Sequence, residues 1–457
     1  MRWTLSEIAA ALEGRMIGAD LTLHGVSTDS RKDCSGQLFV ALKGERFDAH
    51  DYLQMAVQQG AAALLVAREE GLPAGVPAIV VDDTRLALGR MASAWRQRFD
   101  IPLVAVTGSN GKTTTKEMIA AIFRVAYGEQ VLVTQGNLNN DIGLPLTLLG
   151  LEPGHRAAVV EMGMNSPGEI AYLTRIAQPT VAVVTNAQRA HLEGMGCLDG
   201  VAREKASIYE GLGQDGVAVI NCDDAYADLW RNLNRGRPVL GFGLDQAADV
   251  AGRVQLHGLD TRLRLETRDG SRSIELQAAG RHNARNALAA AAVALAAGLD
   301  LDTVATGLAN FAGVKGRLQR RAGIRGAMLL DDTYNANPDS VRAGIDVLAS
   351  TVGRQILVLG DMGEIGEACA QYHDEIGGYA KSQGIDRLYA LGEASQQAVR
   401  NFGEGARHFK TVEALVQALL PELEGGTTVL VKGSRFMKME RIVQALLAPP
   451  ETAKETD

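Results

Sequence analysis

The sequence predicts an α/β protein of three domains, and three observations lead to this prediction. The chain has 457 residues, a length that suggests about three domains of ordinary size. Short apolar runs alternate with helical patterns along most of it, which is typical of mostly parallel sheets covered by helices. One run, LVAVT, leads through a glycine-containing loop into a helix, the order seen where phosphate groups bind. We expect a small α/β domain over residues 1–83, a central mostly parallel-sheet domain with the phosphate loop over 84–313, and a Rossmann-like domain over 314–457.

Composition and charge narrow the class of protein. Hydrophobic residues make up 46% and charged residues 22% of the chain, as in soluble globular proteins, and no apolar run is long enough to span a membrane. The N-terminus lacks the apolar stretch and cleavage site of a signal peptide, so we expect a cytoplasmic protein. A net charge of −8 argues against nucleic-acid binding, because broad nucleic-acid surfaces need massed Lys and Arg. The four cysteines form no CxxC pair and indicate neither a disulfide framework nor a zinc site: Cys34, Cys197, Cys222 and Cys369.

The first domain is expected to combine an N-terminal helix with short strands. Thr4 and Glu7 have the spacing of a capping box, directly before an apolar-periodic helix. Three strand-like runs follow between turns: QLFVALKG, AAALLVA and PAIVVDD. A helical stretch over 84–99 then leads into the central domain.

The other two domains repeat the strand and helix alternation. The central strands are IPLVAVTG, VLVTQ, AAVVEMG, TVAVVTN and VAVINCDD, while residues 247–276 alternate with period 2 and predict an antiparallel appendage. After an Ala-rich helix near 283–297, a second series starts near Val314 with AMLLDD, ILVLGDMGE, RLYALGE and TTVLVKGS. The glycines of GDMGEIG are three apart and do not form a dinucleotide fingerprint. The tail PPETAKETD is expected to fray.

The loop GSNGKTT has the context of a phosphate site but not its commonest spacing. Backbone N–H groups of the loop and the following helix can face an anion, Lys112 can reach the outer phosphates, and Thr113 can bind Mg²⁺. The pattern G-x-x-x-x-G-K-[ST] asks for glycine where Val106 stands. The alternative is a glycine-rich turn with a solvated lysine. The predicted ATP-binding residues here are Gly108, Ser109, Asn110, Gly111, Lys112, Thr113 and Thr114.

Polar residues end several of the predicted parallel strands, at the edge where ligands bind in such sheets. Glu161, His191 and Thr113 together suit a divalent metal beside a triphosphate. The alternatives are a surface loop for His191 and a salt bridge for Glu161. Lys205 by itself is typical of a solvated helix face. Asn283 and Asn286, three residues apart, could cap the Ala-rich helix or offer amides to a purine ring.

The set of motifs resembles the Mur ligases of peptidoglycan synthesis. The blocks TGSNGKTTTKEM, GNLNNDIGLPLTLL, EMGMNSPGEI, TNAQRAHLEGMG, GRHNARNALAA and GRLQRR are similar to those of the family and occur in its order, so the resemblance covers essentially the whole chain. DDTYNANPDS and VKGSR resemble the member that adds a dipeptide. The member that adds the third amino acid usually has an Asp-His block at Tyr334–Asn337 and a D-N-P-R block, neither of which this chain has.

The resemblance implies a role for each domain and for single residues. The N-terminal domain would bind UDP, through Ser30, Arg31, Lys43, Asp48 and His50. In the central domain, ATP and two Mg²⁺ ions would bind, with Lys112, His191 and Lys205 as catalytic residues and with Thr113, Glu161, His191 and a carbamylated Lys205 at the metals. Asn283, Arg317 and Asp332 would complete the ATP site. Asn335, Lys432 and Arg435 would bind the amino substrate.

The implied reaction is an ATP-dependent amide synthesis by a cytoplasmic monomer. D-alanyl-D-alanine would be joined to a UDP-N-acetylmuramoyl-tripeptide through an acyl phosphate, releasing ADP and phosphate. Two alternatives stay open at this point: a ligase that adds one amino acid to a UDP-muramoyl peptide or glutamate to a folate, and a non-enzymatic nucleotide-binding switch. The switch is disfavoured because both flanking thirds of the chain are expected to be α/β domains with their own polar motifs.

Overall fold

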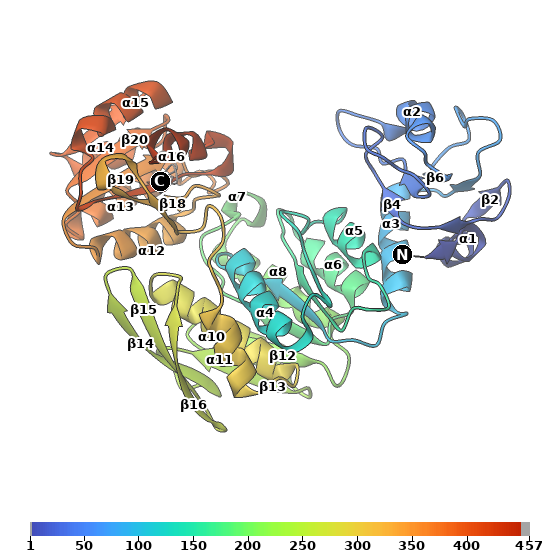
Figure 1. The fold of residues 1–457 in the computed structure, drawn as a ribbon, viewed down its shortest axis with the longest axis horizontal. Coiled ribbons are helices and arrows are strands. Elements are labelled where there is room, and N and C mark those ends of the chain that lie inside the picture. Colours follow the sequence, from blue (N-terminus) through green and yellow to red (C-terminus); the bar gives the residue numbers. More distant parts are fainter. Residues whose placement is uncertain (1, 449–457) are drawn as a thin grey trace, which may run out of the picture.

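The computed structural model describes residues 2–448, so the predicted frayed tail at 449–457 lies outside the described residues. Three α/β domains follow one another along the chain. The N-terminal and C-terminal domains lie at opposite ends of the molecule with the central domain between them (Figure 1). The predicted mixed α/β architecture in three domains is confirmed. Among residues 2–448, no helix combines the length and apolar character that a membrane span needs.

The N-terminal domain is built on a five-stranded sheet in the order β2-β7-β6-β5-β4, parallel except at β2. The predicted capping box is present, since Thr4 accepts from the Glu7 backbone and Glu7 from that of Thr4 at the start of α1 (Leu5–Leu12). The other helix is α2 (Leu53–Gln58), preceded by a 3-10 turn, Ala49–Tyr52. The strands are β1 (Trp3–Thr4) and β3 (Thr22–Leu23), which pair with each other, and β2 (Arg15–Ile17), β4 (Val26–Ser27), β5 (Leu38–Val40), β6 (Ala63–Val66) and β7 (Ala78–Val80).

The central domain has a nine-stranded sheet in the order β16-β15-β14-β13-β12-β11-β8-β10-β9. The predicted antiparallel segment continues this sheet, because β14 pairs in parallel with β13, a strand that the sequence patterns did not indicate. The strands are β8 (Leu103–Thr107), β9 (Val131–Val133), β10 (Ala157–Glu161), β11 (Val181–Val184), β12 (Val217–Asn221), β13 (Val239–Gly243), β14 (Val250–His257), β15 (Asp260–Thr267) and β16 (Gly270–Leu276).

Helices cover both faces of the parallel part of the central sheet, which explains its continuous apolar strands. In β8, Leu103 and Ala105 pack with the core around α3, α5 and α6, whereas Val104 and Val106 face the core around α4 and α10. The predicted helix at 84–99 ends at Arg96 and packs against both α1 and α5. The helices are α3 (Thr84–Arg96), α4 (Lys112–Tyr127), α5 (Gly143–Leu149), α6 (Glu169–Ala177), α7 (Leu192–Met195), α8 (Leu198–Ala206), α9 (Ala227–Leu233), α10 (Arg281–Ala296) and α11 (Leu301–Ala309).

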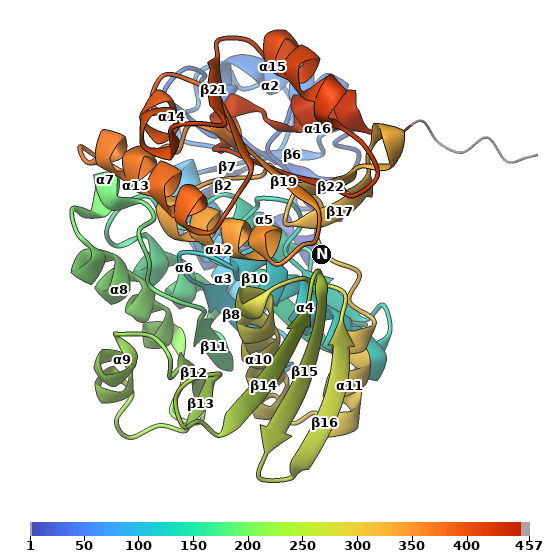
Figure 2. The ribbon, with the colours of Figure 1, turned by 90° about the vertical axis from the view of Figure 1, so that its left-hand side faces the viewer.

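The C-terminal domain has a six-stranded sheet in the order β17-β18-β22-β19-β20-β21, parallel except for the edge strand β17. β17 and β21 are additions to the four strands predicted. Helices α12 and α13 lie on the side that faces the central domain (Figure 2). The strands are β17 (Gln319–Ala322), β18 (Met328–Asp332), β19 (Arg354–Gly360), β20 (Arg387–Leu391), β21 (Ala406–Phe409) and β22 (Thr427–Lys432), and the helices are α12 (Pro338–Ala349), α13 (Cys369–Ser382), α14 (Gln396–Phe402), α15 (Val412–Leu419) and α16 (Glu440–Leu446).

Candidate functional site

The phosphate loop connects β8 to α4 and is held from the side by the loop that follows β11. Ser109 N–H donates to the Asn186 carbonyl at 3.0 Å, and Asn110 N–H donates to Asn186 Oδ1 at 2.9 Å. Helix α4 begins without a side-chain cap after Gly111, which leaves its first N–H groups directed at the loop. Lys112 Nζ donates to the Gly108 carbonyl at 2.7 Å, so its ammonium lies against the same loop as the first N–H groups of α4. This arrangement suits a bound polyanion.

Close packing against neighbouring loops explains where the glycines of this loop stand. Gly108 has φ +150°, and a Cβ there would lie 1.8 Å from Thr185 Oγ1. Gly111 has φ +80°, and its Cβ would lie 2.3 Å from Asn286 Oδ1. Val106, where the commoner pattern has glycine, is instead a buried strand residue. The glycines therefore stand where the loop needs positive φ and close approach.

Glu161 ends β10 beside the phosphate loop, with one carboxylate oxygen engaged and one free. Oε1 accepts from Asn139 Nδ2 at 2.8 Å, and the Glu161 backbone N–H donates to Thr134 Oγ1 at 3.0 Å. Oε2 is buried and has no hydrogen-bond partner within residues 2–448. A buried carboxylate oxygen without a partner is costly unless a ligand or cation satisfies it. The salt-bridge alternative for Glu161 therefore does not hold within the described residues.

His191 lines a cavity of about 450 Å³ together with Lys112 and Glu161, and it contacts the C-terminal domain there. This cavity is called the main cavity below. Its backbone is left-handed, with φ +57°, and its Nδ1 lies 2.9 Å from Glu364 Oε2. Glu364 belongs to the loop GDMGEIG, and the hydrogen bond to His191 holds the pKa of Glu364 below its usual value. This loop of the C-terminal domain therefore contacts the central domain. Its glycine spacing had not predicted a dinucleotide site. His191 is mostly buried, which contradicts the surface-loop alternative.

Lys205 is not on a solvated helix face. The residue is 1% exposed on α8, and burial followed by the charge of Lys112 lowers its pKa well below the usual lysine value. The adjacent carboxylate of Glu204 is engaged elsewhere, since it accepts from the backbone N–H groups of Gly168 and Ile170 at 2.9 and 2.8 Å. Local sequence could not reveal this burial, because it comes from the packing of α8 against the domain core.

A second cavity of about 260 Å³ extends from the phosphate loop towards the C-terminal domain. Asn283 and Asn286 line it, and Asn283 Oδ1 accepts from Asn286 Nδ2 at 3.1 Å. The N-cap of α10 is Gly280, so neither amide has the capping role that the sequence left open. Arg317 also lines this cavity, with its guanidinium 4.0 Å from the centre of the Tyr334 ring. Size and amide lining suit a nucleoside.

Asp332 and Lys432 form a buried ion pair at the C-terminal side of that cavity. Lys432 Nζ donates to Asp332 Oδ2 at 2.6 Å and to the Asn335 carbonyl at 3.0 Å, while Asp332 Oδ1 accepts from Leu318 N–H at 3.1 Å. Burial lowers the pKa of Lys432 although Asp332 opposes this shift. Arg435, unlike Lys432, is exposed, and it pairs with Glu440 at 2.9 Å. All three predicted amino-substrate residues, Asn335, Lys432 and Arg435, line the main cavity. Lys432 already has a carboxylate partner there, Asp332.

His282 lines the 260 Å³ cavity and is expected to make stability depend on pH. Burial lowers its pKa to about 4, whereas an unfolded histidine titrates near its ordinary value of about 6.5. Between these values the unfolded chain binds more protons, so stability falls as pH decreases. Relative to the His282→Gln variant, the wild type should lose about 1 to 2 kcal/mol of unfolding free energy between pH 7 and pH 5. Urea unfolding of both proteins at the two pH values measures this difference, and parallel curves would contradict it.

The predicted UDP residues lie between the strands of the N-terminal domain, and two of them, Asp48 and His50, bond each other at the 3-10 turn. His50 Nδ1 bonds Asp48 Oδ1 at 2.6 Å and His50 Nε2 accepts from Ala67 N–H at 2.9 Å, so both ring nitrogens are engaged. Arg31 pairs with Asp29 at 2.8 Å and is exposed. Lys43 is exposed and Ser30 partly so. Their role in UDP binding stays a prediction.

Glu161, which lines the main cavity, and Thr113, the neighbour of Lys112, fit Mg²⁺ only with further ligands from a bound phosphate. Within residues 2–448 no three or more His, Cys, Asp or Glu side chains form a ready metal cluster. The unpaired Oε2 of Glu161 and the Thr113 hydroxyl are oxygen donors of the kind Mg²⁺ prefers. Mg²⁺ in nucleotide sites usually takes one or two protein oxygens and completes its shell with phosphates and water. The donor set therefore fits a nucleotide-bound ion.

Known proteins match the chain over nearly its whole length. Three family models fit successive segments: "Mur ligase family, catalytic domain" residues 22–96, "Mur ligase middle domain" 106–294, and "Mur ligase, glutamate ligase domain" 316–435. A relative from Escherichia coli named UDP-N-acetylmuramoyl-tripeptide--D-alanyl-D-alanine ligase is 44% identical over 447 residues, covering 97% of this chain and 98% of its own. The chain belongs to the Mur ligase family. The resemblance seen in the sequence motifs is confirmed.

Solved Mur ligase structures agree with this membership. MurF from Acinetobacter baumannii superimposes with a TM-score of 0.92 at 36% identity, covering 97% of this chain and 98% of that one. MurF from Thermotoga maritima, solved in complex with ADP, superimposes with a TM-score of 0.82 at 27% identity, covering 92% and 96%.

Several contacts between the central and C-terminal domains of this Mur ligase were not anticipated from the sequence. Glu364 bonds His191, and Asn337 exchanges hydrogen bonds with Asn110 across the domain interface. Arg189, within the quoted block TNAQRAHLEGMG, bonds Asp339 and Glu375. These partners are separated by well over a hundred positions, so no local pattern could pair them.

Proposed function

We propose that this Mur ligase joins D-alanyl-D-alanine to a UDP-N-acetylmuramoyl-tripeptide, using ATP and releasing ADP and phosphate. The main observation is the 450 Å³ cavity, which is lined by Lys112, Glu161 and His191 from the central domain and by Asn335 and Lys432 from the C-terminal domain. Such a cavity can hold the reacting groups of a phosphoryl donor and of two further reactants at one point. The full-length likeness to a ligase named for this reaction supports the choice of substrates.

Each domain has a part in this proposal, with boundaries near residues 83 and 313. The N-terminal domain would bind the UDP moiety, the central domain ATP, and the C-terminal domain the dipeptide. Asn283, Arg317 and Asp332 would contact the nucleotide, and Asn335 and Arg435 the dipeptide, with Lys432 holding Asp332 in place. We place the enzyme in the cytoplasm, where ATP is available, and expect a monomer.

The reaction needs ATP because a carboxylate is a poor electrophile. A terminal carboxylate oxygen of the tripeptide attacks the γ-phosphorus, the bond to ADP breaks, and an acyl phosphate forms. Lys112, near the loop carbonyls, neutralises charge that develops on the transferred group. The dipeptide amine then attacks the acyl carbon, loses its proton, and phosphate leaves from the tetrahedral intermediate. Holding both reactants between two docked domains supplies orientation and excludes water.

Two Mg²⁺ ions are part of the proposal. Thr113, Glu161 and His191 would hold them, and a carbamate on Lys205 would add an anionic oxygen ligand. Bound Mg²⁺ supplies Lewis-acid neutralisation of the phosphoryl oxygens. Lys205 is suited to carbamylation because its neutral amine, favoured by burial, is the form that reacts with CO₂.

A coupled assay of ADP release tests the proposed reaction and separates it from its alternatives. ADP should appear only when ATP, a UDP-tripeptide and D-alanyl-D-alanine are all present, because the acyl phosphate forms on one substrate and is resolved by the other. Running the assay with tripeptides that end in diaminopimelate or in lysine identifies the third residue. Release that depends on a free diamino acid or on folate would reject this function in favour of another ligase, and release that needs no acyl substrate would indicate a nucleotide switch.

A further inference from the structure

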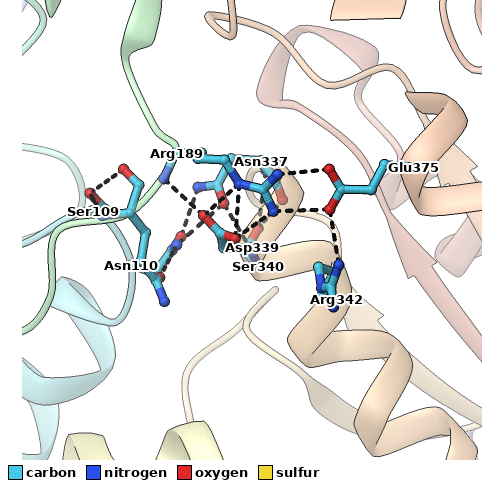
Figure 3. Close-up of polar contacts among 9 residues, drawn as sticks. Ser109, Asn110, Arg189, Asn337, Asp339, Ser340, Arg342 and Glu375 are labelled. Carbon is cyan, nitrogen blue, oxygen red and sulfur yellow. Dashed lines mark hydrogen bonds and ion pairs between the residues drawn. The ribbon is translucent and has the colours of Figure 1, made fainter. Parts of the chain in front are cut away.

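A network of ion pairs joins the central and C-terminal domains at Arg189 (Figure 3). Arg189 Nη2 donates to Asp339 Oδ1 at 2.7 Å, and the Arg189 backbone N–H donates to Asp339 Oδ2 at 2.8 Å. On the other side, Nη1 donates to Glu375 Oε2 at 2.8 Å and Nη2 to Oε1 at 3.1 Å. One guanidinium therefore bridges carboxylates on α12 and α13, using the planar fork that only arginine provides.

These pairs are partly shielded from water. The side chains of Arg189, Asp339 and Glu375 are 24%, 21% and 32% exposed. Burial disfavours the charge of Arg189, but hydrogen bonds to the two carboxylates outweigh burial and raise its pKa, while the bond from Arg189 lowers that of Glu375. Arg189 and Glu375 thus stay charged at neutral pH. Fully exposed ion pairs contribute little, so this shielding gives the contact more weight than the surface pairs elsewhere.

The same segment holds the phosphate loop. Gln188, next to Arg189, accepts from Asn110 Nδ2 at 2.7 Å through Oε1 and donates its N–H to Ser109 Oγ at 2.9 Å. Asn110 also contacts the C-terminal domain directly, since its Oδ1 accepts from Asn337 Nδ2 at 2.8 Å. Asn337 caps α12, two residues before Asp339. Figure 3 shows the phosphate-loop residues on one side of this chain of contacts and Glu375 on the other.

We propose that Arg189 is a positioning residue, which links the docking of the C-terminal domain to the geometry of the phosphate loop. This inference rests on the function proposed above. Docking of α12 and α13 places two carboxylates around Arg189, and this fixes Gln188, whose amide and N–H in turn orient Asn110 and Ser109. Phosphoryl transfer is then tied to the docked arrangement, in which the dipeptide-binding domain covers the site, and ATP is protected from reaction before that domain is in place.

Steady-state ADP release by matched variants tests this link. Arg189→Met removes the bridge, and Glu375→Gln weakens it from the other domain without changing side-chain shape. Arg175→Met is the control, because Arg175 forms an exposed pair with Glu210 inside the central domain. We expect kcat to fall at least about tenfold for Arg189→Met and about threefold for Glu375→Gln, with the KM for the UDP-tripeptide unchanged. The double variant should match Arg189→Met alone, since both changes remove one link.

Two further measurements separate positioning from a merely structural role. Small-angle scattering with ATP and both substrates should give a larger radius of gyration for Arg189→Met than for the wild type, while their urea midpoints agree. A kcat of Arg189→Met equal to that of Arg175→Met, or single effects that multiply in the double variant, would overturn the inference. If Arg189→Met fails to fold, Glu375→Gln tests the inference by itself. A kcat of Glu375→Gln equal to that of the wild type would then overturn it. If the wild type itself shows no substrate-dependent ADP release, the proposed function is overturned as well. If the wild type turns over normally and the variants show no effect, only the inference about Arg189 is overturned.

Discussion

Replacing Lys112 by alanine will lower the rate of ADP release at least about a hundredfold. The Lys112 ammonium lies 2.7 Å from the Gly108 carbonyl at the start of α4, where the phosphates of ATP would bind. Burial lowers its pKa and the charge of Glu161 opposes that shift. A preorganised cation in a water-poor site stabilises charge that develops during phosphoryl transfer far better than solvent does. The loss should therefore appear in kcat as well as in kcat/KM.

The control for this experiment is Lys410→Ala, which removes an exposed lysine of the C-terminal domain. It should leave the rate unchanged, because an isolated surface charge far from the site contributes little. Thermal unfolding of Lys112→Ala should resemble that of the wild type, which separates chemistry from folding. A folded Lys112→Ala protein that ligates at a near-normal rate would reject the role of this lysine and, with it, the phosphate loop as the ATP site.

Replacing Lys205 by arginine should lower activity roughly a hundredfold, because arginine keeps the positive charge but cannot form a carbamate that holds Mg²⁺. The wild-type residue is buried, and its depressed pKa leaves more neutral amine near pH 8 than an exposed lysine would have. Carbamate content should therefore rise with bicarbonate, and it should fall as pH decreases through the pKa of Lys205, where the ammonium form takes over. Intact-protein mass and ¹³C NMR after incubation with labelled bicarbonate detect the carbamate directly, apart from any rate measurement.

Two results would contradict this prediction for Lys205. A Lys205→Arg protein with normal activity would show that only the charge matters. A wild-type protein with an unmodified amine at saturating bicarbonate would leave Lys205 as a buried lysine next to Lys112, with an electrostatic role. The exposed Lys410 serves again as the control, because an ordinary lysine should show no labelled carbamate under the same conditions.

Local sequence predicted most of the secondary structure because each element leaves a pattern within a few residues. Leu103 to Val106 are apolar at every position, and the structure buries them alternately on the two faces of the central sheet. Thr4 and Glu7 marked the first helix through their own side chains. The sequence patterns missed the short strands β1, β2, β3 and β4 of the N-terminal domain, each two or three residues long. They also missed β13, β17 and β21, which are edge or junction strands, and β17 has a polar sequence, QRRA, that carries no strand period. Their pairing depends on neighbours that are distant in the chain.

The sequence by itself predicted the three-domain α/β architecture and the phosphate loop, and its family motifs pointed to Glu161, His191 and Lys205. Only the tertiary structure decided their surroundings: that Lys205 is buried, that His191 contacts Glu364, and that Arg189 bridges two carboxylates of another domain. The physical reason is the range of the interactions. Periodicity and capping act between residues a few positions apart, whereas desolvation and ion pairing depend on which distant segments the fold brings within a few ångströms.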